Sequence, residues 1–220
     1  MKFIPNILTL ANAALGCCSL FFIANLDFDM ATLCVLLAAA FDFFDGFVAR
    51  NMGWRSQLGA ELDSLADVIS FGVVPGALST VILTTLNVDY PWIFFGFIIT
   101  LASAYRLANY NTSENSQTYF KGLPTPANAL LWIGFPHLDL DLTLPLLVGG
   151  IVITAYLLNS SLIFYRFQFK KSVTYFVFVL LIILSLFFMW MRFGHGVWSL
   201  AVIIYVLLSI MYRLFMKSKG

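Results

Sequence analysis

Charged side chains are scarce in this sequence. They make up 10% of the 220 residues, while 61% of the residues are hydrophobic. Soluble domains carry about 25% charged residues, so the scarcity excludes an ordinary soluble domain. The net charge of +1 predicts no nucleic-acid partner. The chain is therefore expected to lie in a membrane.

Several other features are missing. The three cysteines, Cys17, Cys18 and Cys34, lie in apolar runs, and their spacing fits no zinc site. The sequence contains no G-x-x-x-x-G-K-[ST] stretch, which excludes a P-loop nucleotide site. No repeat, low-complexity tract or long hydrophilic linker divides the chain. A single membrane domain over residues 1–220 is the simplest organisation.

Long apolar runs occur from one end of the chain to the other. A helix needs about 20 apolar residues to cross a hydrocarbon core of about 30 Å. The runs predict an all-α integral membrane protein, a polytopic bundle of about eight transmembrane helices, with a six-helix catalytic core as an alternative. The expected segments are 4–25, 30–50, 58–85, 91–111, 125–137, 143–164, 172–191 and 197–216, and the fifth is short for a complete crossing.

The positions of the basic residues indicate an orientation. If the N-terminus is cytoplasmic and all eight segments cross, eleven of the twelve Lys and Arg residues fall on the cytoplasmic side, and only Arg192 falls outside. This distribution follows the positive-inside rule. Both termini are therefore predicted to be cytoplasmic. The membrane is expected to be the plasma membrane of a prokaryote.

Acidic residues interrupt the apolar pattern in "AAAFDFFDGFVARNMGWRSQLGAELDSLADVISFG". Asp42 and Asp45 are three residues apart, and Asp63 and Asp67 are four apart, so each pair lies on one face of a helix. A turn containing Gly53 joins the two helices and makes them antiparallel neighbours. The four carboxylates then converge, and their charge in apolar surroundings needs compensation. Hard divalent cations prefer such oxygen ligands, and two of them would form a two-metal site for phosphoryl displacement.

Small and polar neighbours support a phosphate-bearing ligand. Gly46 and Gly59 have no side chain where a bulky ligand approaches the backbone. Arg50 and Ser56 are placed to bind phosphate oxygens, which implies a diphosphate substrate. Glu61 is out of phase with the aspartates of its helix and is expected to be solvated. A cation transporter lined by acidic residues is the alternative from a different class, but transporters usually show interrupted helices in two corresponding halves.

The spacing Asp42-x2-Asp45-Gly46-x2-Ala49-Arg50-x8-Gly59-x3-Asp63-x3-Asp67 resembles the signature of the CDP-alcohol phosphotransferase family. The resemblance implies a membrane enzyme dependent on Mg²⁺ or Mn²⁺, in which an incoming hydroxyl displaces CMP from a CDP-linked lipid. By position, the four aspartates would be the metal ligands, and Asp67 would also be the general base. The resemblance further implies a homodimer and a set of CDP-binding residues: Asn6, Thr9, Gly46, Ala49, Arg50, Ser56 and Gly59.

Segments outside the motif indicate the acceptor alcohol. The stretches "PNILTLANAALGC", "LDSLADVISFGVVPG" and "RLANYNTSENSQTYFKGLPTPANALL" resemble the phosphatidylserine synthases of that family. This resemblance implies CDP-diacylglycerol and L-serine as substrates at the cytoplasmic side of the membrane. Serine is a zwitterion, and Arg106, Asn109 and Lys121 are the candidate residues that bind it. Glycerol 3-phosphate and inositol phosphate are the alternative acceptors, although their dianionic phosphate would call for more basic residues near the metals.

Overall fold

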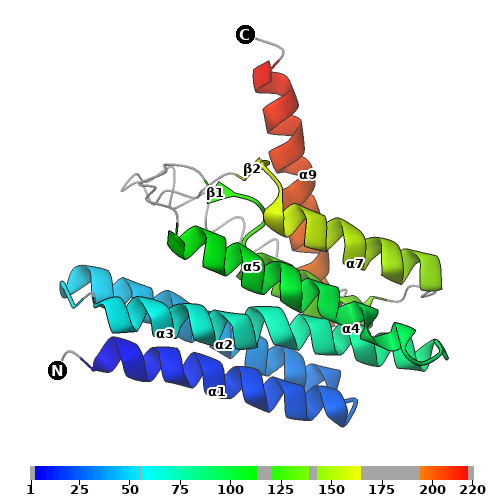
Figure 1. The fold of residues 1–220 in the computed structure, drawn as a ribbon, viewed down its shortest axis with the longest axis horizontal. Helices are drawn as coiled ribbons and strands as arrows, with labels where there is room; N and C mark the ends of the chain where they lie inside the picture. Colours follow the sequence, from blue (N-terminus) through cyan, green and yellow to red (C-terminus); the bar gives the residue numbers. More distant parts are fainter. Residues whose placement is uncertain (1–2, 55, 113–119, 139–142, 165–193, 218–220) are drawn as a thin grey trace.

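The structure is a computed structural model that describes residues 3–54, 56–112, 120–138, 143–164 and 194–217. This part of the chain is helical apart from two short strands (Figure 1). The helical elements are α1 (Ile4–Ala24), α2 (Phe28–Asn51), α3 (Gln57–Asp67), η1 (Val68–Val73), α4 (Val74–Thr85), η2 (Trp92–Phe97), α5 (Ile98–Thr112), α6 (Thr125–Gly134), η3 (Phe135–His137), α7 (Leu144–Asn159), η4 (Gly194–Gly196) and α9 (Val197–Lys217).

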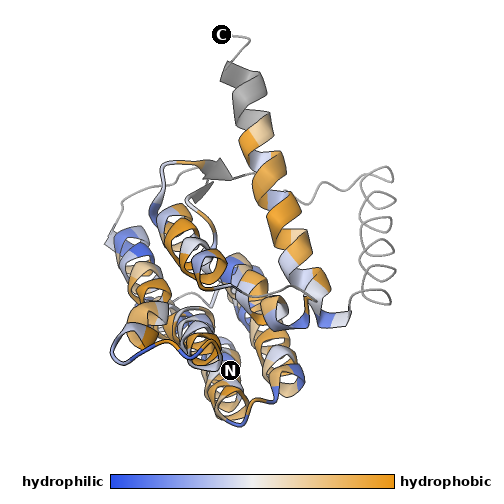
Figure 2. Cartoon of the chain, turned by 90° about the vertical axis from the view of Figure 1, so that its right-hand side faces the viewer, coloured by the Kyte–Doolittle hydropathy of each residue, from blue (hydrophilic) through white to orange (hydrophobic). Residues whose placement is uncertain are grey.

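Five helical segments of the described residues are long and apolar enough to cross a membrane. They confirm the prediction of a helical, multi-pass membrane protein. Large apolar side chains such as Phe21 and Leu101 are exposed, and apolar residues colour much of the helix surfaces in Figure 2. In a bilayer these faces would contact lipid tails rather than water. The five segments are Ile4–Ala24, Phe28–Asn51, Gln57–Thr85, Trp92–Thr112 and Gly194–Met211.

Two predicted crossings are short in the structure. α6 has 10 residues and α7 has 16, so α6 rises by only about 15 Å, half of a hydrocarbon core. α6 is instead an interior helix, in which Ala129, Trp132 and Ile133 are at most 1% exposed. The predicted segment 172–191 lies outside the described residues. The total of eight crossings and the cytoplasmic termini therefore stay predictions.

The α1–α2 hairpin is held by buried hydroxyl groups. Asp27 caps the start of α2 by accepting a hydrogen bond from the Met30 backbone N–H. The Ser19 hydroxyl of α1 donates to the Ala31 carbonyl at 3.1 Å. On its other side α2 contacts α6, where the Thr32 hydroxyl donates to the Ile133 carbonyl at 3.2 Å. These contacts fix the rotation of α2 and therefore the direction in which its aspartates point.

A single helical segment runs from Gln57 to Thr85 and contains an irregular stretch. The sequence places a kink or packing adjustment near Pro75. In the structure the irregularity is the π-helical η1, which begins directly after Asp67 and ends two residues before Pro75. α1 approaches η1 closely, and the Ser70 hydroxyl donates to the Asn12 carbonyl at 2.9 Å. The irregular stretch therefore lies beside the aspartates of α3.

A two-residue strand pairing joins the segment before α6 to the segment after α7. β1 (Phe120–Lys121) runs antiparallel to β2 (Ile163–Phe164), with Phe120 opposite Phe164. Gly122 has a φ of 79° and donates its N–H to the Leu162 carbonyl at 2.9 Å. This left-handed backbone favours glycine. The pairing is a small addition to the all-α fold that the sequence predicts.

Gly16→Val is expected to destabilise the protein, because a side chain at this position has no room between α1 and η1. A Cβ on Gly16 would lie 3.0 Å from the Ser70 Cα and 3.1 Å from the Ile69 Cγ2. Overpacking of this kind costs about 1–3 kcal/mol. The melting temperature in detergent should fall, whereas Gly149→Ala is the matched control, since its Cβ meets no atom within 4 Å. Equal melting temperatures for the two variants would contradict the close approach of α1 and η1.

Candidate active site

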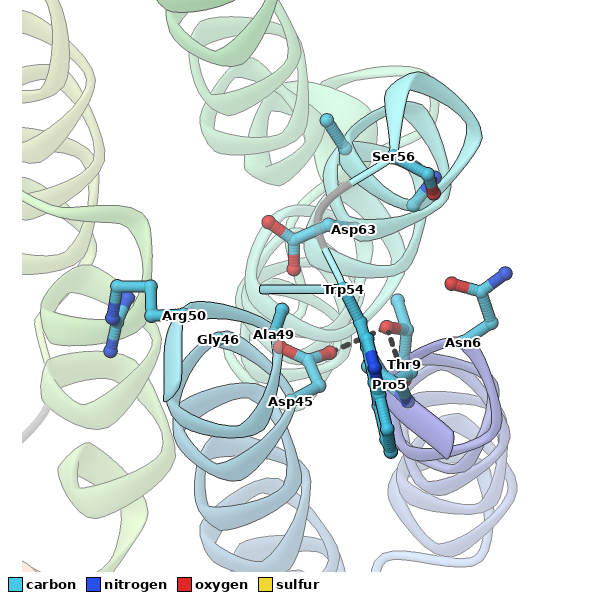
Figure 3. Close-up of a pocket in the computed structure, with 12 residues that line it drawn as sticks. Pro5, Asn6, Thr9, Asp45, Gly46, Ala49, Arg50, Trp54, Ser56 and Asp63 are labelled. Carbon is cyan, nitrogen blue, oxygen red and sulfur yellow. Dashed lines mark hydrogen bonds between the residues drawn. The ribbon is translucent and has the colours of Figure 1, made fainter. Parts of the chain in front are cut away.

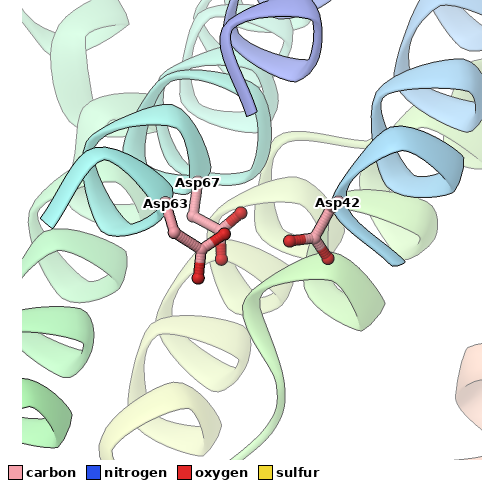
Figure 4. Close-up of side chains that lie close together, drawn as sticks. All are labelled: Asp42, Asp63 and Asp67. Carbon is pink, nitrogen blue, oxygen red and sulfur yellow. The ribbon is translucent and has the colours of Figure 1, made fainter. Parts of the chain in front are cut away.

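Three carboxylates converge between α2 and α3. One oxygen each of Asp42, Asp63 and Asp67 lies within 4.8 Å of the others. Figure 4 shows Asp63 and Asp67 on α3, with Asp42 facing them from α2. The four-residue spacing on α3 stacks two carboxylates on one helix face. The turn after α2 brings the third against them, as the sequence pattern predicts.

Asp45 is separated from this group by a contact with α1. It is 5% exposed, and its Oδ2 accepts a hydrogen bond from the Thr9 hydroxyl at 2.5 Å. The same hydroxyl lies 2.9 Å from the Pro5 carbonyl. A hydroxyl has one proton to donate, and the shorter contact to a charged acceptor is the stronger one. Thr9 therefore anchors Asp45 to α1.

α1 contributes a polar stripe that faces the carboxylates. Asn6, Thr9 and Asn12 recur at intervals of three residues in a largely apolar helix. Asn12 is fully buried, and its Nδ2 donates to the Asp67 Oδ1 at 3.4 Å. Its own Oδ1 is buried without a hydrogen-bond partner in the described structure. The sequence reasoning did not select Asn12, although the i, i+3 spacing of three polar residues was the signal that could have found it.

A pocket opens beside Asp45 and Asp63 (Figure 3). It encloses about 650 Å³ of empty space, part of which is open to solvent. All seven residues that the sequence selects as CDP-binding line it, together with Pro5, Asp45, Trp54, Ala60 and Asp63.

Small residues keep this pocket open. A Cβ on Gly59 would lie 3.0 Å from the Ser56 Oγ and 3.2 Å from the Asn6 Oδ1. Ser56 itself caps α3, since its Oγ accepts the Gly59 N–H at 3.0 Å. Gly46 leaves similar room for Arg50, because a Cβ on Gly46 would lie 3.2 Å from the Arg50 Nη1. The glycines therefore allow polar side chains to lie against the backbone at the pocket wall.

Of the candidate serine-binding residues, Arg106 is the one that the structure places near the carboxylates. Its guanidinium interacts electrostatically with Asp67, and its Nε is buried without a hydrogen-bond partner in the described structure. Asn109 lies one turn further along α5 and is exposed. Lys121 belongs to β1, and its side chain lies outside the described residues. Arg106 is therefore the candidate serine-binding residue whose charge can act beside Asp67.

The carboxylate group fits a hard divalent cation. Its potential ligands are oxygens from two helices, and the Asp63 Oδ1 is buried without a hydrogen-bond donor among the described residues. Mg²⁺ and Mn²⁺ both take carboxylate oxygens. Asp42, Asp63 and Asp67 form the group that can hold one ion together. Asp45 is the fourth carboxylate of the motif and lies at the pocket wall.

The model of the CDP-alcohol phosphatidyltransferase family matches residues 2–198 of this chain. The chain belongs to this family. The match extends well beyond the acidic motif and includes α1, the pocket residues and the start of α9. The family depends on divalent metal ions, and this chain has an acidic cluster that could hold such an ion.

Relatives within the family carry names that describe an activity. A CDP-diacylglycerol--serine O-phosphatidyltransferase from Helicobacter pylori is 34% identical over 196 residues, 84% of this chain and 81% of the relative. An enzyme of the same name from Bacillus subtilis is 29% identical over 171 residues, 76% of this chain and 93% of the relative. An archaetidylserine synthase from Methanothermobacter thermautotrophicus is 35% identical over 130 residues, 58% of this chain and 54% of the relative.

Mg²⁺ or Mn²⁺ should raise the melting temperature of the purified protein, because an ion that binds only the folded state stabilises it. Asp42→Asn and Asp63→Asn should each remove most of this increase. Glu61→Gln is the matched control: Glu61 is exposed on the same helix as Asp63 and is not part of the carboxylate group. An increase that survives both aspartate substitutions would place the ion elsewhere.

Proposed function

We propose that this family member transfers the phosphatidyl group from CDP-diacylglycerol to the hydroxyl of L-serine, releasing CMP. The observation that supports the proposal most is the carboxylate group beside a pocket lined by all seven expected nucleotide-binding residues. The relatives named as serine phosphatidyltransferases support serine as the acceptor.

The pocket between α1, α2 and α3 would hold the CDP group. Arg50 and Ser56 line this pocket and carry donors that could bind phosphate oxygens. Gly46, Ala49 and Gly59 leave room for the nucleotide beside the helix backbone. Asp42, Asp45, Asp63 and Asp67 would hold two divalent ions, since two such ions match four carboxylate charges. Bound Mg²⁺ or Mn²⁺ would neutralise charge on the phosphoryl oxygens.

The reaction would proceed on the side of the carboxylate group that includes Asp67. The serine Oγ forms a bond to the phosphorus of the phosphatidyl group, and the bond from that phosphorus to the CMP oxygen breaks. The hydroxyl proton passes to the Asp67 carboxylate, which acts as the general base. The Asn12 amide, which donates to Asp67 at 3.4 Å, orients that carboxylate.

Arg106 would bind the carboxylate of serine. Its Nε is buried without a hydrogen-bond partner among the described residues, and an arginine can bind a carboxylate through two parallel hydrogen bonds. Asn109, one turn away, and Lys121, in the following segment, would complete the serine site at its cytoplasmic edge. The distribution of basic residues supports an active site on the cytoplasmic side of the plasma membrane. We also propose that the protein forms a homodimer, and this part of the proposal rests on the family resemblance alone.

An acceptor screen tests this function. Purified protein in Mg²⁺ should release CMP from CDP-diacylglycerol when serine is added, and should release little with glycerol 3-phosphate or inositol phosphate. In inverted membrane vesicles added serine should reach the site, whereas in sealed right-side-out vesicles it should not. Release of CMP only with a phosphorylated acceptor would overturn the assignment of serine, and no release with any acceptor would overturn the enzymatic function.

Arg106→Ala should act on serine in the same assay. We expect kcat/KM for serine to fall by about ten- to a hundredfold, the effect of losing one charge-assisted contact, while CMP binding stays close to wild type. Arg106→Lys keeps the charge but loses the paired hydrogen bonds. Its kcat/KM for serine should therefore lie between the values for wild type and Arg106→Ala. Equal losses for serine and CMP would instead indicate a structural role for Arg106.

Asp67→Asn should separate the base from the metal ligands. The amide keeps one oxygen ligand but cannot accept the serine proton, so turnover should fall by about 10² or more. The increase in melting temperature with Mg²⁺ and the affinity for CMP should be largely kept. If turnover and both binding signals are lost together, Asp67 acts mainly as a ligand, and another carboxylate accepts the proton.

A further inference from the structure

The turn at the end of α2 places an aromatic ring at the nucleotide pocket. α2 ends at Asn51, and Met52, its C-cap, donates its N–H to the Val48 carbonyl at 3.0 Å. Gly53 follows with a φ of 65°, and the Trp54 N–H returns to the Ala49 carbonyl at 3.1 Å. A left-handed residue followed by this return bond is the Schellman arrangement. It directs the chain back over the last turn of α2.

Glycine is needed at position 53 because of its backbone conformation. A Cβ there would meet no atom within 4 Å, so space does not explain the residue. The positive φ explains the glycine, since residues with a side chain rarely adopt such a φ. The residue that follows in a Schellman arrangement commonly packs against the helix end. For this chain that residue is Trp54, and the helix end includes Ala49, which lines the pocket.

Trp54 forms one wall of the pocket. In Figure 3 its ring is seen edge-on and extends from the turn toward Pro5 of α1, beside the hydrogen bond between Thr9 and Asp45. It is the single aromatic side chain among the described residues that line the pocket. The other lining residues include the small residues Gly46, Ala49 and Gly59. A flat ring beside small residues forms a slot suited to another flat ring.

We propose that Trp54 stacks on the pyrimidine base of the CDP group and so contributes to nucleotide affinity. The inference rests on the proposed function, which places a cytidine nucleotide in this pocket. Arg50, Ser56 and the carboxylate group account for the diphosphate end of such a ligand, but none of them offers a surface to a base. Stacking of a base on an aromatic side chain typically contributes about tenfold or more to affinity by alanine substitution.

The alternative role of Trp54 is an anchor at the membrane surface, where tryptophan is common. An anchor would affect insertion and stability but would not contact the nucleotide. The two roles predict different results for a water-soluble ligand. CMP is such a ligand, because it carries the base and ribose without the lipid.

The experiment measures CMP affinity and steady-state kinetics of detergent-purified variants in Mg²⁺. Trp54→Ala should weaken CMP binding by about tenfold or more and raise the KM for CDP-diacylglycerol similarly, with the KM for serine little changed. Trp54→Phe keeps a ring and should lose much less. Trp92→Ala is the matched control, since Trp92 is 67% exposed at the start of η2 and does not line the pocket. Inhibition by pyrophosphate, which has no base, should be the same in wild type and Trp54→Ala.

Fluorescence provides a second test if Trp54→Ala does not fold. CMP should quench part of the tryptophan emission of the wild-type protein, and Trp54→Phe should lose that quenching while it still binds CMP. Wild-type affinity for CMP in Trp54→Ala, or unchanged quenching in Trp54→Phe, would overturn the stacking role. A wild-type protein that neither binds CMP nor releases it from CDP-diacylglycerol would instead overturn the proposed function.

Discussion

Repulsion among the aspartates is the constraint that the rest of the site accommodates. Asp42, Asp63 and Asp67 bring oxygens within 4.8 Å of one another on helices that run through apolar surroundings. Charges so close, with little water, repel strongly. In the described structure Thr9 donates to Asp45, and Asn12 donates to Asp67. Arg50, near Asp42 and Asp45, and Arg106, near Asp67, add positive charge. Two neutral donors orient carboxylates but do not neutralise them, so the arrangement favours cation binding.

α1 is part of this accommodation as well as a membrane span. Its buried face consists largely of small or polar residues, including Thr9, Asn12, Gly16 and Ser19. The small residues let α1 lie against α2 and η1, and the polar ones then reach the carboxylates. The π-helical η1 completes the contact, because its register turns the Ser70 hydroxyl toward the Asn12 carbonyl while Phe71 stays in the core. Irregular turns of this kind are frequent at functional sites.

The sequence predicted the parts of the site that depend on local helix geometry. The spacing of the aspartates fixes which carboxylates share a helix face, and three of the four that were expected to converge, Asp42, Asp63 and Asp67, form one group in the structure. The contact of Asp45 with Thr9 joins residues 36 positions apart, so no local pattern reveals it. The length of α6 was also hard to predict, because an interior helix and a membrane-spanning helix are equally apolar. The sequence also did not select Trp54, because its place at the pocket depends on the left-handed turn at Gly53.

The site divides into two sides that match the two ends of an in-line displacement. Asp45 and Asp63 line the pocket, where the nucleotide would leave, whereas Asp67 is contacted by Asn12 and lies near Arg106 of α5. In such a displacement the entering and leaving oxygens lie on opposite sides of the phosphorus. Under the proposed function, α1, α2 and α3 select the nucleotide, and α5 selects the acceptor. Under the same proposal, the guanidinium of Arg106, which the described residues place near Asp67, would match the single carboxylate of serine, whereas a dianionic phosphate would leave charge uncompensated beside the aspartates.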